Sequence, residues 1–277
     1  MFDRHVRVKQ AGLGGYDKVL DQPLIDLLNS ADLTIGNLEG PITTNPSRSV
    51  GSAVGSPNNY NFTFDPAIVP ALKTFGFGIV ILGNNHILNQ GYEGLTATEE
   101  YLRNGSIGYF GDTGTETPST ILSDVALVGE QLRVGLVNYN QFTPGSYERS
   151  LQILREMESA DDVTLGRSSD FQVVYTHWGN EYVPENQVLK NQAKAFVDAG
   201  ADLVIGSHPH VVTGHELLEG KHVYYSLGNF IFDQYFEPAV MEGLVVEVTI
   251  NTQTGEVTAK EHYVDIGKDG VTRLRVD

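Results

Sequence analysis

Apolar and polar positions follow two patterns along most of the chain, short apolar runs and stretches of helical spacing. The apolar runs predict strands over residues 32–36, 77–82, 132–138, 171–176 and 202–206. Helical spacing is found over residues 23–29, 66–74, 92–104, 147–160 and 186–199, with Asp65 as the expected N-cap of the second helix. Strands and helices that alternate in this order indicate βα units and a largely parallel sheet.

The pattern changes after His210. Residues 211–218, 223–227, 244–251, 256–264 and 271–276 are strand-like and joined by short turns, so we expect antiparallel strands there. No linker rich in proline and serine separates the two parts, and we therefore predict a single domain over residues 1–277. Residues 45–59, rich in Ser, Gly, Pro and Asn, predict a mobile loop.

The composition is that of a folded protein with an acidic surface. The chain has 277 residues, 40% of them apolar, enough to bury a sizeable core. It carries 18 basic and 35 acidic residues, a formal net charge of −17, and a field of that sign repels nucleic acid and anionic membrane surfaces. We therefore exclude both as general partners, and expect an anionic substrate to bind only where metal ions or a basic cluster reverse the sign.

The sequence also lacks the residues for cysteine chemistry and for a membrane-spanning segment. Without cysteine there are no disulfides, thiolate zinc sites or cysteine nucleophiles. No apolar run reaches the roughly 18–20 residues of a membrane span, and no basic and then apolar signal segment follows Met1. We expect no direct membrane insertion by this chain.

Polar side chains follow four of the predicted strands at the points where the strands end. The four clusters are Asn37-Leu38-Glu39, Asn84-Asn85-His86, His177-Trp178-Gly179 and His208-Pro209-His210. In an open α/β sheet, ligands bind outside the carboxyl ends of the strands, so these clusters converge if the strands are parallel neighbours. Imidazole, carboxylate and amide oxygen suit zinc, manganese or iron. Two such ions about 3.5–4 Å apart would generate a hydroxide nucleophile for displacement at phosphorus.

Each cluster alone also has a structural explanation. His208 and His210 could be turn residues, His177 a core histidine, the Asn84-Asn85 pair a helix N-cap, and Glu39 part of a solvated turn. Their joint occurrence after four strand-like segments favours a shared site. Asn37, Asn84, Ser226 and Asn229 are candidates for hydrogen bonds to the ligands or to substrate. For residues 224–230 (YYSLGNF), the residues alone favour a buried aromatic strand that ends in a turn.

Five stretches together resemble the capsule-synthesis CapA family, or poly-gamma-glutamate biosynthesis proteins, within the calcineurin-like metallophosphoesterase superfamily. They are ADLTIGNLEGPIT at 31–43, GNNHILNQGYEGLTATEEYL at 83–102, THWGNEY at 176–182, AGADLVIGSHPHV at 199–211 and YYSLGNFIFDQ at 224–234. The resemblance covers about residues 1–234. It implies a four-layer α/β sandwich of two mixed sheets flanked by helices.

The resemblance also implies roles for individual residues. Asn85, His177, His208 and His210 correspond to metal ligands of the superfamily, and His86 to the acid that approaches the leaving group. Glu39 looks like the family's replacement for a bridging aspartate. The implied cofactors are two divalent ions, with Mn, Fe and Zn not distinguished.

One departure from the family concerns the start of the sequence. The family opens with a buried strand that ends in Gly-Asp, and Met1-Phe2-Asp3-Arg4 looks like the continuation after it. We expect that first strand and its metal-binding aspartate to be missing here, with Asp3 placed too late to substitute. Activity of this chain is then expected to be weak or absent until the strand is restored.

The resemblance leaves three functions open. The first is a metal-dependent hydrolase of phosphoesters or related anionic bonds, acting on a small molecule or polymer in cell-envelope metabolism. The second is a non-catalytic accessory component of poly-gamma-glutamate assembly or export, working in a capsule-assembly complex. The third is a hydrolase of the gamma-glutamyl bond. The family implies a bacterial cell-envelope location, with any membrane anchor in a segment outside this sequence.

Overall fold

The computed structural model describes residues 1–115, 117–126, 131–158 and 169–276. The chain divides into two compact units. Unit 1 comprises Met1–Tyr109, Asn229–Gly243 and Tyr263–Asp277, and unit 2 comprises Phe110–Gly228 and Leu244–His262.

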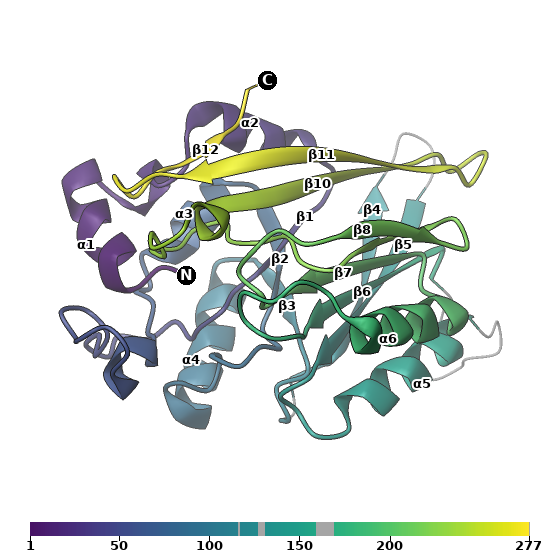
Figure 1. Cartoon of the computed structure of the whole chain (residues 1–277), viewed down its shortest axis with the longest axis horizontal. Helices are drawn as coiled ribbons and strands as arrows, with labels where there is room; N and C mark the ends of the chain where they lie inside the picture. Colours follow the sequence, from purple (N-terminus) through teal and green to yellow (C-terminus); the bar gives the residue numbers. More distant parts are fainter. Residues whose placement is uncertain (116, 127–130, 159–168, 277) are drawn as a thin grey trace. The chain divides into compact units, whose positions relative to one another are not determined.

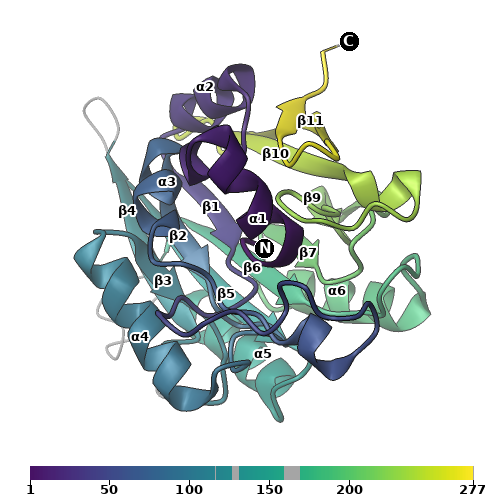
Figure 2. The ribbon, with the colours of Figure 1, turned by 90° about the vertical axis from the view of Figure 1, so that its left-hand side faces the viewer.

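Unit 1 is built around a small sheet with the order β1-β2-β3. Its strands are β1 (Thr34–Asn37), β2 (Phe77–Ile81) and β3 (Gly108–Phe110), and they run side by side in Figure 2. β1 and β2 are parallel, with Asn37 opposite Ile81. The helices are α1 (Arg4–Leu13), α2 (Gln22–Ser30), α3 (Ile68–Thr74) and α4 (Gly91–Asn104), with 3-10 turns at Tyr16–Lys18, Pro57–Tyr60 and Pro238–Met241.

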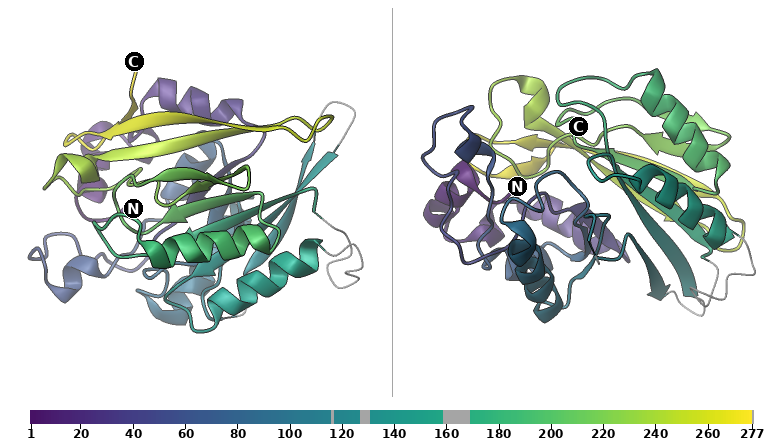
Figure 3. Two further views of the ribbon diagram at one scale, coloured as in Figure 1. Left: turned by 45° about the vertical axis from the view of Figure 1, so that its right-hand side comes forward. Right: turned by 90° about the horizontal axis from the view of Figure 1, so that it is seen from below.

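Unit 2 holds a six-stranded sheet with the order β4-β5-β6-β7-β9-β8. Its strands are β4 (Thr120–Ala126), β5 (Gln131–Asn140), β6 (Phe171–His177), β7 (Leu203–Ser207), β8 (His215–Leu218) and β9 (Lys221–Tyr224). Helices α5 (Ser146–Glu158) and α6 (Gln187–Asp198) lie together on one face of this sheet (Figures 1 and 3). Their buried residues Leu154 and Phe196 form one core with Val174 and Trp178.

A third sheet, β10-β11-β12, is drawn from both units. It consists of β10 (Glu242–Ile250), β11 (Val257–Ile266) and β12 (Thr272–Leu274), and β11 and β12 are antiparallel. The fold is therefore mixed α/β, with parallel and mixed sheets and helices, as predicted. The four-layer order stays a prediction.

The structure corrects several predicted elements. Helix α3 begins at Ile68 and not at residue 66, because Asp65 forms a turn before it. The Asp65 side chain accepts the backbone amide of Ala67, and the Asp65 carbonyl accepts the backbone amide of Ile68. Strand β9 pairs antiparallel with β8 but parallel with β7, so the strands after His210 are not all antiparallel. Residues 159 and 160 of the predicted fourth helix lie outside the described residues.

Three elements were not predicted, α1, β3 and β4. The expected parallel strands are also divided between two sheets, β1 and β2 in one and β5, β6 and β7 in the other. Among the helices of the described ranges, none is long and apolar enough to cross a membrane.

Candidate metal centre

The first group of candidate residues follows the parallel pair β1 and β2, and we call it the β1–β2 group: Asn37, Glu39, Asn84, Asn85 and His86. Because Asn37 lies opposite Ile81, both strands end at the same edge of the sheet. The segments that follow them therefore start side by side. Asn84 is buried, whereas Asn85 and His86, which follow it, are partly exposed.

A chain of hydrogen bonds holds the carboxylate of Glu39. The side-chain amide of Asn84 donates to Oδ1 of Asn37 at 3.1 Å and to the carbonyl of Leu38 at 3.0 Å. The amide of Asn37 in turn donates to Oε2 of Glu39 at 3.1 Å. Since Asn84 is buried, this chain fixes the position of the largely buried Glu39. The structure therefore places Asn37 and Asn84 in hydrogen bonds that support one predicted ligand.

The ring of His86 is oriented by Asn89. Oδ1 of Asn89 accepts the backbone amide of Phe62 at 2.8 Å and lies 3.1 Å from Nδ1 of His86. An amide oxygen only accepts, so Nδ1 of His86 carries its proton. The ring also packs edge-on against Phe62, with centroids 4.7 Å apart. His86 thus presents Nε2 as the atom that can hold or release a second proton.

Asp3 is engaged elsewhere in unit 1. Its Oδ2 accepts the backbone amide of Thr63 at 2.9 Å, and the side chain is buried. The expectation that Asp3 is not a metal ligand stays a prediction.

The second group follows the parallel pair β6 and β7, and we call it the β6–β7 group: His177, His208 and His210. His177 is the last residue of β6 and lies opposite Ser207 at the end of β7. The hydroxyl of Ser207 donates to the carbonyl of Thr176 at 2.8 Å and lies 3.0 Å from Nδ1 of His177. Because the single hydroxyl proton is used on Thr176, Ser207 accepts from Nδ1–H, which leaves the lone pair of His177 on Nε2.

His208 and His210 lie in a turn with unusual backbone angles. Their φ values are 99° and 61°, in the region that glycine adopts most easily, at a cost of about 1–3 kcal/mol each. The rings of His177 and His208 have centroids 4.9 Å apart, and those of His208 and His210 are 6.1 Å apart. All three histidines are buried. Three imidazoles held this close, two of them on a strained turn, are typical of a ligand site.

Gln141 supports this group and was not predicted from the sequence. Its amide nitrogen donates to the carbonyl of Gly179 at 2.6 Å, while its amide oxygen accepts the Gly179 N–H at 2.8 Å. The backbone amide of Gln141 also donates to the carbonyl of His177 at 3.0 Å. Gln141 thus fixes the backbone on both sides of Trp178. Like the predicted clusters, it follows an apolar run, and that feature could have identified it.

Two aromatic side chains pack against the histidines from the loops. Phe142, 46% exposed, lies edge-on to His208 with centroids 4.9 Å apart. Tyr182, 42% exposed, lies 6.0 Å from the ring of His210 and is held by its backbone amide, which donates to Pro209. These rings restrict the rotamers of the histidines beneath them.

Ser226 and Asn229 both lie in buried turns after β9. The hydroxyl oxygen of Ser226 accepts the amide of Gly228 at 3.2 Å, within unit 2. In unit 1, the amide of Asn229 donates to the carbonyl of Val240 at 2.9 Å and to Gln234 at 3.0 Å. These bonds shape the turns, and the predicted contacts of both residues with ligands or substrate stay predictions.

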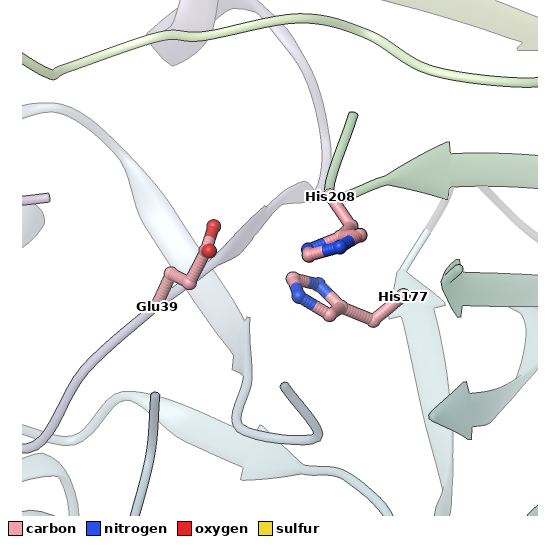
Figure 4. A group of neighbouring side chains, drawn as sticks. All are labelled: Glu39, His177 and His208. Atoms are coloured by element: carbon pink, nitrogen blue, oxygen red, sulfur yellow. The ribbon is translucent and has the colours of Figure 1, made fainter. Parts of the chain in front are cut away.

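The donor atoms of each group are of kinds that bind divalent metal ions. Figure 4 shows Glu39, from the segment after β1, and the adjacent rings of His177 and His208, from the ends of β6 and β7. Each of the three side chains offers one ligand atom, a carboxylate oxygen or an imidazole nitrogen. The Nδ1–H bond of His177 to Ser207 is the support that metal-binding histidines ordinarily have. The donor set suits zinc, manganese or iron.

Comparison with known proteins places these residues in a family context. The sequence model of a family described as "Bacterial capsule synthesis protein PGA_cap" matches residues 1–234. This range includes every member of the β1–β2 and β6–β7 groups.

Individual relatives agree with this match. The chain is 30% identical over 221 residues to "Capsule biosynthesis protein CapA" of Bacillus anthracis, covering 75% of this chain and 52% of that protein. It is 27% identical over 225 residues to "PGA biosynthesis protein CapA" of Bacillus subtilis, covering 75% and 55%. A "Probable polyglutamine synthesis accessory protein" of Mycobacterium tuberculosis is 28% identical over 192 residues, covering 62% and 50%. The chain thus spans about half the length of these relatives.

Proposed function

Because this chain belongs to the bacterial capsule synthesis protein family, we propose that it is a metal-dependent hydrolase of phosphoester or related anionic bonds in capsule or poly-gamma-glutamate synthesis. The observation that carries the proposal is the state of His177. Its Nδ1–H is bound to Ser207, which puts the lone pair of the ring on Nε2, and the ring lies beside a second histidine, His208. A buried pair of imidazoles oriented in this way is more typical of metal ligands than of histidines that only fill a hydrophobic core.

The ligands of the proposed centre are Glu39, Asn85, His177, His208 and His210, and they would hold two divalent ions. When bound, such ions polarise the bond under attack and lower the pKa of water, which supplies a nucleophile at neutral pH. The protein's own part is to fix the donors. Asn37 and Asn84 hold Glu39, Ser207 holds His177, and the aromatic rings of Phe142 and Tyr182 hold His208 and His210.

His86 is the proposed general acid. Its Nδ1 proton is bound to Asn89, so a second proton on Nε2 can pass to the leaving oxygen. The ring is held by Phe62, which limits its rotation. Asn229 and Ser226 are proposed to contact ligands or substrate from the turns after β9.

The substrate is proposed to be anionic, either a small molecule or a polymer. With a net charge of −17, the protein attracts such a substrate only where the ions reverse the local sign. The relatives' names support a role in capsule or poly-gamma-glutamate synthesis, and the proposal includes a capsule-assembly complex at the bacterial cell envelope.

A second candidate is a non-catalytic role in the same assembly. It is favoured by the name of the mycobacterial relative, an accessory protein. In that case the histidines would bind a metal that stabilises the fold and turns over no substrate. The two candidate functions differ in whether His86 is needed, as a general acid, for turnover of a substrate.

The deciding experiment assays purified protein with added Mn²⁺, Fe²⁺ or Zn²⁺ on a phosphomonoester, a phosphodiester and a gamma-glutamyl peptide. We expect weak phosphoester turnover by this chain, which falls a further ~10²–10⁴-fold in His86→Ala while bound metal is unchanged. His262→Ala is the control, because His262 pairs with Glu247 at 2.8 Å on strands β10 and β11. Metal binding without turnover of any substrate favours the accessory role. Turnover of the peptide alone assigns the gamma-glutamyl bond.

A further inference from the structure

A second set of histidines lies on strands β8 and β9 of unit 2, and neither of its members belongs to the two groups described above. β8 is an edge strand of the six-stranded sheet. His215 lies opposite Tyr224, and Leu217 lies opposite His222. Since residues two apart on a strand share a face, His215, His222 and Tyr224 project from the same face of the sheet.

The two imidazole rings are held nearly parallel with their nitrogens in contact. Nε2 of His215 lies 2.9 Å from Nδ1 of His222, and the ring planes differ by 8°. His215 also stacks on Tyr224, with centroids 4.2 Å apart and planes within 5°. Stacking opposes large rotations of the His215 ring about its Cβ–Cγ bond and allows small ones.

A carboxylate on β11 determines the tautomer of His215. Oε1 of Glu261 lies 3.5 Å from Nδ1 of His215, so a proton on that nitrogen is favoured. The lone pair of His215 is then on Nε2, facing His222. A histidine that donates one N–H to a carboxylate and offers its other nitrogen is the usual form of a metal-binding histidine.

We propose that His215 and His222 form a separate site for a divalent transition ion of the nickel(II) or copper(II) type, bound through Nε2 of His215 and Nδ1 of His222. Two nitrogens bound at about 2.0–2.1 Å lie about 2.9 Å apart at a right angle, but about 3.3–3.4 Å apart at the tetrahedral angle. The observed 2.9 Å fits neighbouring positions of a square-planar or octahedral ion. Water completes the coordination.

Binding moves one proton and breaks one hydrogen bond. The proton on Nδ1 of His222 transfers to Nε2 of the same ring, so His222 stays neutral and Nδ1 becomes a donor to the ion. Both rings turn to direct their lone pairs at the ion.

The site is open to ions from solvent, since the side chains of His215 and Glu261 are 31% and 34% exposed. An ion there joins the edge strand β8 to β9 by a bond in addition to their backbone ladder. Because the ion binds the folded protein, it raises the midpoint of thermal unfolding.

The test is calorimetric titration of the protein with Ni²⁺, comparing the number of ions bound by variants. We expect His215→Gln and His222→Gln each to lose one equivalent, while His177→Ala loses a different one. Glu261→Gln is expected to keep the equivalent but bind it about 10–100-fold more weakly. His262→Gln is the control, because wild-type His262 pairs with Glu247 and not with another histidine of the described residues. This variant should bind as the wild type does.

Unchanged binding in either His215→Gln or His222→Gln overturns the proposal, and so does an equal loss in His262→Gln. Circular dichroism shows whether each variant is folded. If either His215→Gln or His222→Gln does not fold, the binding of the other variant decides the question. The proposed hydrolase centre is tested separately, because its ligands are unchanged in the variants of His215 and His222.

Discussion

The hydroxyl oxygen of Ser207 lies 3.0 Å from Nδ1 of His177 and decides which nitrogen of that ring can bind a metal. The Ser207 proton is donated to the carbonyl of Thr176, so the oxygen can only accept from the ring. His177 is buried, and without this bond its ring could rotate or change tautomer. The metal site therefore depends on a serine that would not itself touch the ion.

Replacing Ser207 by Ala should lower metal affinity. We expect a decrease of about 10–100-fold, because the acceptor that holds Nδ1–H is lost while the ligands remain. Titration with Zn²⁺ or Mn²⁺ measures it. Ser150→Ala is the matched control, since that buried hydroxyl donates to backbone carbonyls of Ser146 and Tyr147 within α5. An affinity that falls equally in both variants would mean that Ser207 acts only through stability.

Gln141→Leu should destabilise the fold. The buried peptide groups of Gly179 lose both their partners, which we expect to cost about 1–3 kcal/mol of unfolding free energy. Urea denaturation measures the change. Gln152→Leu is the control, because Gln152 is exposed and pairs with Glu156 one turn away, so a change within about 0.5 kcal/mol is expected. Equal stability of the two variants would contradict the assigned role of Gln141.

Gly206→Ala should disturb the end of β7 just before His208. A Cβ atom there would lie 2.0 Å from the backbone carbonyl oxygen of Tyr225 and 2.7 Å from Nε1 of Trp178. We expect a loss of about 1–3 kcal/mol or more, since backbone has to move. Gly12→Ala in α1 meets no atom within 4 Å and should stabilise by about 0.5–1 kcal/mol. A higher midpoint of thermal unfolding for Gly206→Ala than for Gly12→Ala would refute the close contact of Gly206 with Tyr225.

Arg275 should contribute stability that depends on pH. It forms ion pairs with Asp265 and with Glu242, the latter at 2.7 Å. The hydrogen bond from Arg275 holds the pKa of Asp265 below its ordinary value of 3.8. A lowered carboxyl pKa gives stability that is full above the unfolded pKa and is lost as pH falls through the folded one.

We therefore expect Arg275→Gln to lose about 0.5–1 kcal/mol at pH 7, a modest amount because the pair is solvent-exposed. The difference from wild type should shrink as pH falls below about 3.8. Urea denaturation at several pH values measures both. Arg103→Gln is the comparison, because Arg103 donates to the neutral hydroxyl of Tyr109. A difference that grows on acidification would have the wrong sign.

The sequence predicts the strands that carry the candidate ligands well, for a physical reason. Buried strands such as β6 and β7 are continuous apolar runs, and the polar residues that end them are conspicuous. The apolar runs alone therefore place His177 and Ser207 at the ends of strands. Their position as direct neighbours across β6 and β7 depends on register, which the sequence does not specify.

Other features depend on tertiary packing and were missed. In α1, Val6 and Val8 alternate with charged residues at the period of a strand, yet the segment is helical and buries only Val6. The short turn at residues 218–221 indicates the antiparallel pair β8–β9, but not that β9 also pairs parallel with β7. Gln141 follows an apolar run, which could have marked it as a candidate, but its two bonds to Gly179 depend on tertiary packing that the sequence does not specify.

Metal analysis of the purified protein tests the central claim most directly. We predict a bound divalent transition ion that is retained through gel filtration and lost in His177→Ala and in His208→Ala, while both variants stay folded. A protein that binds no divalent ion, or that binds as much after both histidines are replaced, would contradict the proposed metal centre.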